Sequence, residues 1–181
     1  MPELNNQNFN HLKIHTQYSI CEGAIKIDNL KDFCEEKKIP CLCLSDTSNL
    51  CGALEFAENI SKVGTQPIIG TQIYFRFEDT TGLLPLIALN ENGYKKIIEL
   101  SSRSYLENDA LSDPHLDIKE LLIDTEGVSL LSGTIQGLFG KLFEKGRLDE
   151  ISKLYKSLSS KFNDNFYFCL LYTSPSPRDV E

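Results

Sequence analysis

Two spacings of apolar residues recur along the chain, and they predict alternating strands and helices. Apolar residues three and four positions apart, such as Ile27, Leu30 and Cys34, indicate an amphipathic helix. A run that is apolar on both faces, such as CLCLSD after Pro40, is typical of a parallel strand covered on both sides. These patterns predict strands at residues 9–15, 41–46, 67–77, 83–89, 128–131 and 166–168, and helices at residues 27–38, 54–62, 90–105, 117–123, 138–145 and 148–162.

The predicted order of elements, with strands and helices alternating throughout, places the chain in the α/β class. Parallel strands joined by crossover helices are the usual outcome of such an order. In a βα barrel the carboxyl ends of the strands converge on one functional face. The length of 181 residues fits one domain or a large piece of one, and nothing within residues 1–168 resembles an interdomain linker or a fixed-period repeat.

Composition narrows the class of protein further. Hydrophobic residues make up 41% and charged residues 24%, an ordinary globular balance that excludes a disordered tail, a collagen-like fibre and a coiled coil. The net charge of -8 makes this segment alone a poor candidate for binding nucleic acid, because it repels phosphate groups. No run approaches the roughly 18 apolar residues of a membrane span, and the polar N-terminus lacks a secretory signal. A cytoplasmic protein without a membrane partner is expected.

Six cysteines are present, but their spacing does not favour a disulfide framework or a zinc knuckle. None of them forms a Cys-x-x-Cys pair, and a reducing compartment is expected in the absence of a signal peptide. We therefore expect free thiols that pack as small hydrophobic side chains. The cysteines are Cys21, Cys34, Cys41, Cys43, Cys51 and Cys169.

The last residues differ in character from the rest of the chain. Residues 169–179 read CLLYTSPSPRD, where a strand gives way abruptly to Ser and Pro. Such a segment is either a disordered Ser/Pro tail or, as we favour, the in-frame translation of a sequencing adapter. On the second interpretation residues 169–181 are foreign, an assembly artefact, and the natural sequence departs from this one near Phe168.

Candidate chemistry gathers at the predicted strand ends. Side chains on a strand alternate between two faces, so His11, Lys13 and His15 share one face of the first strand. Asp46 ends the second strand, and Glu22 follows the first. Histidines and carboxylates together are ligands for zinc or manganese, so these side chains could in principle form a metal site.

Lys13 favours a different interpretation of the same cluster. A protonated ammonium repels a bound cation and has no lone pair to offer. It could replace the cation and pair with Asp46 or Glu22, and histidines at a strand end are often structural, hydrogen-bonded residues. The residues alone therefore disfavour a loaded metal site and leave the partner of Lys13 open.

Several runs, in order, resemble one family. These are FNHLKIHTQYSICEGA, IPCLCLSDTSNLCGALEF, TQPIIGTQIYF, NENGYKKIIELSSRSYLE and GVSLLSGTIQGLFGKLF. They are similar to the N-terminal PHP domain (polymerase and histidinol phosphatase) of bacterial DNA polymerase III alpha subunits, in its alphaproteobacterial form. The similarity is collinear over residues 8–168, and several motifs in sequence are more specific than a lone fingerprint.

The resemblance implies a distorted, seven-stranded, TIM-like βα barrel that is only partly present, with residues 1–168 as a partial PHP domain. Metal-binding members carry metal ligands at positions that Lys13, Thr47, Gln72, Leu83 and Thr134 occupy here. Each replacement removes a lone pair or a negative charge, so the resemblance implies a vestigial site with no metal and no catalytic residue. The vestigial positions are His11, Lys13, His15, Glu22, Asp46, Thr47, Gln72, Leu83 and Thr134.

For function, the resemblance implies a non-catalytic part of a DNA-directed DNA polymerase, a nucleotidyltransferase of DNA replication. The implied partners are the proofreading exonuclease subunit and other replisome subunits. DNA and the magnesium of the polymerase palm would be bound by parts of the family's chain that these 181 residues lack. Two alternatives stay open: a metal-dependent PHP phosphoesterase or 3'-5' exonuclease that takes ligands from later residues, and a free-standing interaction module for replisome proteins.

Overall fold

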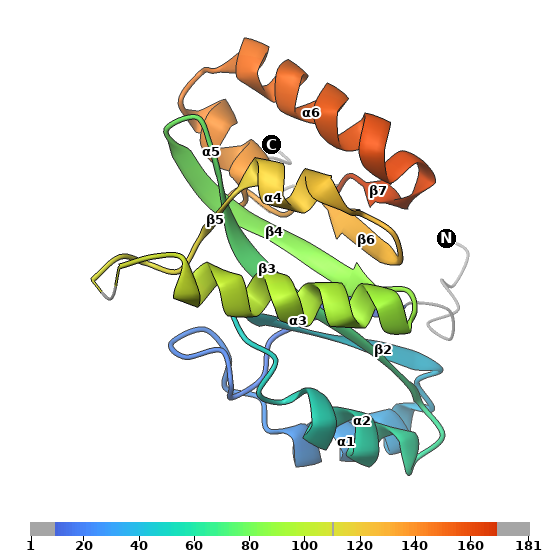
Figure 1. Cartoon of the computed structure of the whole chain (residues 1–181). Coiled ribbons are helices and arrows are strands. Elements are labelled where there is room, and N and C mark those ends of the chain that lie inside the picture. The colour runs from blue at the N-terminus through green and yellow to red at the C-terminus, as the bar shows by residue number, and fades with distance from the viewer. Residues whose placement is uncertain (1–9, 110, 170–181) are drawn as a thin grey trace, which may run out of the picture.

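The computed structural model describes residues 10–109 and 111–169 (Figure 1). Its elements in chain order are β1 (His11–Ile14), α1 (Ile27–Lys37), β2 (Cys41–Thr47), α2 (Ala53–Ser61), β3 (Gln66–Phe77), β4 (Thr80–Ala88), α3 (Glu91–Leu106), β5 (Leu116–Asp117), α4 (Ile118–Ile123), β6 (Val128–Leu131), α5 (Leu138–Glu144), α6 (Leu148–Phe162), a 3-10 turn (Asn163–Asn165) and β7 (Phe166–Tyr167).

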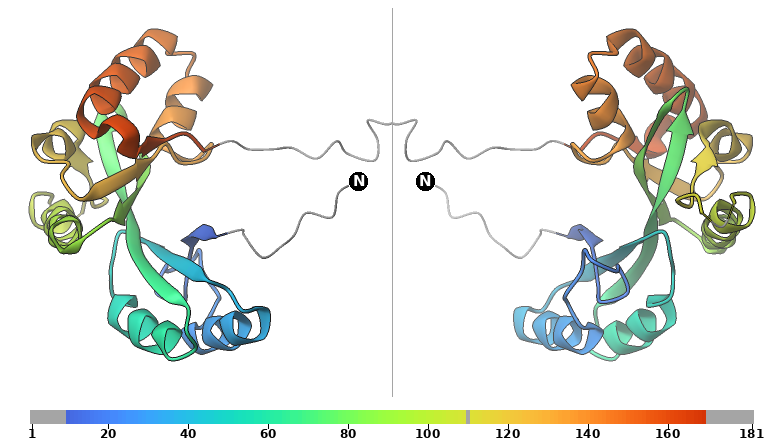
Figure 2. Two further views of the ribbon diagram at one scale, coloured as in Figure 1. Left: turned by 90° about the vertical axis from the view of Figure 1, so that its right-hand side faces the viewer. Right: turned by 90° about the vertical axis from the view of Figure 1, so that its left-hand side faces the viewer.

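One sheet organises the molecule. Its strand order is β1-β2-β3-β4-β6-β7, with β5 paired to the far part of β3. The pairs β1–β2, β2–β3 and β6–β7 are parallel, whereas β4 runs antiparallel to both of its neighbours. The sheet curls into an open C shape with the helices on its convex side (Figure 2). This arrangement confirms the predicted fold class, an incomplete TIM-like βα barrel.

The prediction that strands and helices alternate throughout is wrong at two points: β4 follows β3, and α6 follows α5. β3 and β4 form a hairpin whose turn is Glu78 and Asp79, with Glu78 in the left-handed region at φ 53°. A two-residue connection cannot hold a crossover helix, so β4 returns antiparallel to β3. The loop predicted at residues 107–116 also ends in the short strand β5.

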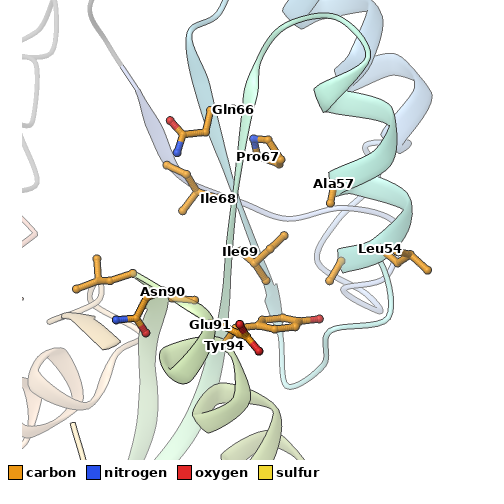
Figure 3. Close-up of a pocket in the computed structure, with 12 residues that line it drawn as sticks. Leu54, Ala57, Gln66, Pro67, Ile68, Ile69, Asn90, Glu91 and Tyr94 are labelled. Carbon is orange, nitrogen blue, oxygen red and sulfur yellow. The ribbon is translucent and has the colours of Figure 1, made fainter. Parts of the chain in front are cut away.

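The missing crossover helix leaves a hollow on the convex side. The hollow has a volume of about 420 Å³ and lies between α2 and α3 (Figure 3). Leu54 and Ala57 of α2, Pro67 and Ile69 of β3, and Tyr94 of α3 line it. The outer face of the β3–β4 pair is therefore uncovered at this place.

Alternation along the strands divides the core in two layers. Leu42 and Leu44 of β2 point outward and pack with Phe56 under α1 and α2. Cys43 points to the concave side, where it packs with Ile87 of β4 and other buried residues. A larger core under α3, α4, α5 and α6 joins the outer face of β3, β4 and β6 to these helices. The pattern explains why β2 is apolar on both faces.

The concave side is open between the first and the last described strands. A groove of about 720 Å³ is lined by Lys13 of β1, Ile87 of β4, Leu131 of β6, and Tyr167 and Cys169 at the end of the described chain. The backbone nitrogen of Cys169 donates to the Ser132 hydroxyl at 2.9 Å. The rest of the predicted foreign tail, residues 170–181, lies outside the described residues.

Cysteine placement is partly as predicted. The cysteines are free thiols, and Cys34 and Cys43 are buried, but Cys21 and Cys51 are exposed. The latter two lie in loops that follow β1 and β2, where no apolar layer covers them. Within residues 10–109 and 111–169, no helix is long and apolar enough to cross a membrane.

Candidate functional site

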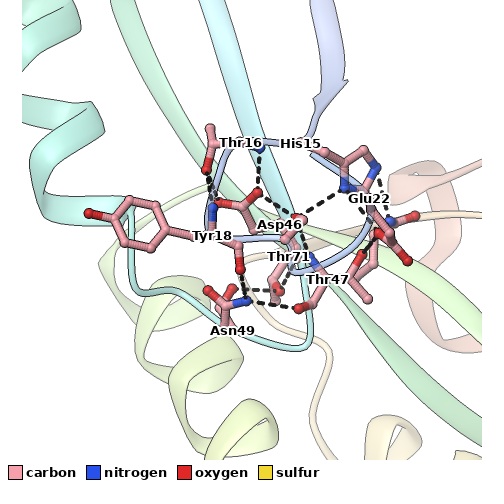
Figure 4. Close-up of polar contacts among 10 residues, drawn as sticks. His15, Thr16, Tyr18, Glu22, Asp46, Thr47, Asn49 and Thr71 are labelled. Carbon is pink, nitrogen blue, oxygen red and sulfur yellow. Dashed lines mark hydrogen bonds and ion pairs between the residues drawn. The ribbon is translucent and has the colours of Figure 1, made fainter. Parts of the chain in front are cut away.

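A buried carboxylate lies at the carboxyl end of β2. Asp46 is 0% exposed. Its Oδ1 accepts hydrogen bonds from the Thr16 backbone nitrogen and the Ser19 hydroxyl, both at 2.6 Å, and its Oδ2 accepts one from the Thr16 hydroxyl at 2.7 Å (Figure 4). Burial of a charge is unfavourable unless hydrogen bonds compensate it, and three donors do so here.

These contacts fix the loop between β1 and α1. The Ser19 hydroxyl also accepts a hydrogen bond from the Thr47 backbone nitrogen at 3.1 Å. Gln17 donates from its backbone nitrogen to the Ile25 carbonyl at 2.9 Å, which closes the loop on itself. Gly23 is required in this loop because a Cβ there would lie 2.0 Å from the Thr16 carbonyl oxygen. The loop is thus bound to the end of β2 through Thr16 and Ser19 and closed on itself between Gln17 and Ile25.

A second set of polar contacts links β1, β2 and β3 (Figure 4). His15 Nε2 lies 3.1 Å from Gln72 Nε2, and His15 Nδ1 lies 3.3 Å from the Ser19 hydroxyl. Gln72 Nε2 also donates to the Thr47 hydroxyl at 3.2 Å, and that hydroxyl donates to the Glu22 carboxylate. The Glu22 carboxylate lies 3.6 Å from His15 Nδ1. Three neighbouring strands are therefore joined by side chains at one place.

The local charges act on the two basic residues of the cluster. Burial lowers the pKa of the Lys13 ammonium, and the charges of Cys169 and Glu22 oppose that change. Burial also lowers the pKa of His15, and the nearby Lys13 charge lowers it further, against the carboxylates of Glu22 and Asp46. Burial and the Lys13 charge thus both favour a neutral imidazole at position 15.

The structure brings five of the nine predicted positions into one network, namely His15, Glu22, Asp46, Thr47 and Gln72.

The remaining four positions are His11, Lys13, Leu83 and Thr134, and the charge of Lys13 acts on His15 in the network. His11 and Lys13 line an adjoining hollow of about 600 Å³ together with His15 and Glu22. Ile14 also lines it, and the β1–β2 register shifts between His11 and Ile14, so the common face of His11, Lys13 and His15 stays a prediction. Thr134 lines the concave groove together with His11 and Lys13, and Leu83 bridges to Gly137, whose backbone nitrogen donates to the Thr134 carbonyl at 2.8 Å.

Lys13 does not pair with Asp46, one of the two carboxylates that the sequence offered as its partner. The Asp46 carboxylate is occupied by Thr16 and Ser19, and among the described residues Lys13 forms no ion pair with it within 4.0 Å. Sequence reasoning did not identify Thr16 or Ser19 as parts of this network. The signal that could have found them is a Thr and a Ser directly after a strand, a pattern that often bonds to nearby polar groups.

The donor set does not fit the metal cluster that the resemblance implies for metal-binding members. Within the described ranges, no three His, Cys, Asp or Glu side chains are grouped so that they could hold an ion. Both ring nitrogens of His15 and the carboxylates of Asp46 and Glu22 already have hydrogen-bond partners in the protein. Thr47 and Gln72 contribute a hydroxyl and an amide where a metal would need stronger ligands.

Comparisons with known proteins identify the family of the chain. The family model of the PHP domain matches residues 11–170, so the chain belongs to the PHP domain family. Its curated relatives are DNA polymerase III alpha subunits. The one from Caulobacter vibrioides is 36% identical over 176 residues, which cover 92% of this chain and 15% of the relative. These findings confirm the resemblance predicted from the sequence.

Further relatives carry the same name. The alpha subunit of Rickettsia felis is 35% identical over 162 residues, covering 88% of this chain and 13% of the relative. That of Vibrio cholerae is 32% identical over 168 residues, covering 91% of this chain and 14% of the relative. The chain thus spans about one seventh of the length of the curated relatives it matches.

Two solved structures overlap with the fold more loosely. An amidohydrolase from Chromobacterium violaceum has a TM-score of 0.45 at 15% identity, covering 54% of this chain and 33% of that chain. A protein assigned as a metal-dependent phosphoesterase, from Bifidobacterium adolescentis, has a TM-score of 0.40 at 15% identity, covering 96% of this chain and 62% of that chain.

Proposed function

We propose that this chain is the PHP region of a DNA polymerase III alpha subunit and serves there as a non-catalytic scaffold. The observation that carries the proposal is the similarity to curated alpha subunits, 31–36% identity over 88–95% of the chain. Nucleotidyl transfer in DNA replication, and the magnesium it needs, would belong to the parts of the longer protein that this chain does not match. Residues 1–168 would be the partial PHP domain.

The polar network supports the non-catalytic part of the proposal. A phosphoesterase site needs lone pairs that are available to a metal ion or to a reacting group. Here His15 Nε2, the two carboxylate oxygens of Asp46 and Glu22 Oε2 face donors from within the protein. The network instead ties the β1–α1 loop to the sheet, which suits a rigid surface for the proofreading exonuclease or another replisome protein in the cytoplasm.

A metal-dependent PHP phosphoesterase is the second candidate. The observation that favours it is the hollow lined by His11, Lys13, His15 and Glu22, where two histidines and a carboxylate are retained. Further ligands would have to come from residues beyond those described. A purified protein with stoichiometric zinc or manganese, and hydrolysis of a phosphate ester that needs it, would favour this candidate over the scaffold.

The experiment that tests the scaffold proposal begins with the source locus. We expect sequencing across codons 168 and 169 to show a reading frame that continues into the rest of an alpha subunit. The protein from that frame is expected to extend a primer on a DNA template with magnesium, and to retain that activity when His15 is changed to Gln. Absence of primer extension by the intact protein would overturn the polymerase assignment. Loss of exonuclease or phosphatase activity in His15→Gln would overturn the non-catalytic role.

A further inference from the structure

We infer that the carboxamide of Gln72 takes the place of a metal ion in this site and positions His15 and Thr47 as a cation otherwise would. The inference rests on the proposed function, in which the site binds no metal. Gln72 is 2% exposed, so water does not compete for its amide hydrogens. It lies opposite Thr47 in the β2–β3 register, beside the ends of β1 and β2.

The amide of Gln72 has two hydrogens, and each has an acceptor. One is directed to the Thr47 hydroxyl, 3.2 Å from Gln72 Nε2. The other faces His15 Nε2 at 3.1 Å. An amide nitrogen can only donate, so His15 Nε2 must be the acceptor and must carry no proton. The lone pair that would otherwise bind a metal ion is thus occupied.

The other side of the imidazole leads independently to the same proton position. The Ser19 hydroxyl has one hydrogen, which it donates to Asp46 Oδ1 at 2.6 Å. It therefore has no hydrogen left for His15 Nδ1, which lies 3.3 Å away. The contact is a hydrogen bond only if Nδ1 carries the proton and Ser19 accepts it. Both neighbours of His15 thus require the same tautomer.

Two chains of hydrogen bonds leave Gln72, and each ends on a carboxylate. One passes through the Thr47 hydroxyl to Glu22. The other passes through His15 and Ser19 to Asp46. A cation would hold the same acceptors by accepting their lone pairs, whereas the neutral amide does so by donating its hydrogens. Glu at position 72 would reverse this: its carboxylate would face the acceptors of His15 and Thr47, and the contact would need a metal ion, a proton, or a rearrangement of the hydrogens on His15 and Thr47.

The first test reads the tautomer of His15 directly. The tag-free 181-residue chain contains three histidines, so ¹⁵N-histidine labelling gives a spectrum in which a His15→Gln variant identifies the signals of His15. At pH 8 we expect His15 to carry its proton on Nδ1. In Gln72→Met, which lacks the amide donors, we expect the signal of the unprotonated Nε2 to shift as its hydrogen bond is lost while Nδ1 keeps its proton, whereas Gln66→Met, at an exposed position of the same strand, leaves the spectrum of His15 unchanged. An Nε2–H tautomer in the unmodified chain would overturn the inference without any variant.

The second test measures zinc binding in a matched pair of variants. Lys13→His and Thr47→His are introduced together, once with Gln72 retained and once with Gln72→Glu. We expect the triple variant to bind zinc at least about 100-fold more tightly than the double variant, since Gln72 donates hydrogens where Glu supplies a metal ligand. Equal zinc affinity in the two variants, with both folded by circular dichroism, would overturn the inference.

Zinc content and the His15 tautomer of the unmodified chain distinguish a failure of the Gln72 role from a failure of the proposed function. Stoichiometric zinc in the unmodified chain would contradict both the non-catalytic scaffold and the role of Gln72. A chain that binds no zinc but carries the His15 proton on Nε2 would contradict the role of Gln72 alone.

Discussion

The carboxylate of Asp46 lies 2.6 Å from the backbone nitrogen of Thr16, which joins the end of β2 to a residue 30 positions earlier in the chain. This contact is buried, and it holds the β1–α1 loop in the position where Ser19, Glu22 and His15 meet the sheet. The position of the β1–α1 loop therefore depends on the Asp46 carboxylate, whose oxygens only accept hydrogen bonds.

Asp46→Asn is expected to destabilise the protein. The amide nitrogen of Asn would face a donor, Thr16 or Ser19, and leave a buried hydrogen unsatisfied, which lowers the free energy of unfolding by about 2–3 kcal/mol. Urea unfolding monitored by circular dichroism measures the change. Asp32→Asn, at an exposed position of α1, is the matched control and is expected to change stability by less than about 0.5 kcal/mol. Equal stabilities of the two variants would show that the Asp46 contacts contribute little.

Much of the architecture could be predicted from the pattern of apolar residues. The helix predicted at residues 148–162 is α6, and the apolar run after Pro40 is β2. The meeting of His15, Glu22 and Asp46, three of the four side chains expected at the strand ends, also follows from local rules, because the carboxyl ends of parallel strands lie at one edge of a sheet. The fourth, His11, lies at the start of β1. These features depend on short stretches of sequence, which is why they could be predicted.

Other features depend on contacts between distant segments and could not be predicted. The turn at Glu78 and Asp79 lacks the Gly or Asn that usually indicates a hairpin, so the reversal of β4 was missed. The direction of the hydrogen bonds around Gln72 depends on which acceptors the fold places beside its amide. Spacing along the sequence carries no information on this direction.

Gly93→Ala is expected to be strongly destabilising, because α3 approaches β6 closely at this residue. A Cβ at position 93 would lie 1.7 Å from the Gly127 carbonyl oxygen, a backbone atom that cannot move aside alone. We expect a loss of about 3 kcal/mol or more in the free energy of unfolding, as for other overpacked sites. Ser102→Ala, on the exposed face of α3, is the control. A Gly93→Ala protein as stable as this control would mean that α3 and β6 can separate at little cost.

Acid is expected to remove a contact between the β3–β4 turn and the start of α6. A hydrogen bond from Arg147 lowers the pKa of Asp79 from 3.8 to about 2. Because the pKa is lower in the folded state, the stabilisation is present above about pH 4 and is lost as the pH falls towards 2. Thermal unfolding of the unmodified chain and of Asp79→Asn should therefore differ most at pH 5–7, and the difference should shrink as the pH falls to 2 and vanish below it. A difference that is independent of pH would contradict a role for the Asp79 charge.

Thiol reactivity is expected to divide the cysteines by burial. Burial raises the pKa of Cys43 to about 12, so at pH 8 this residue is almost entirely the unreactive thiol. Cys34 is also buried with a raised pKa, whereas Cys21 and Cys51 are exposed. With iodoacetamide and peptide mass mapping, we expect early modification of Cys21 and Cys51, and modification of Cys34 and Cys43 only after unfolding in guanidinium. Early modification of Cys43 in the folded protein would show that solvent enters the concave layer in which this thiol packs against Ile87.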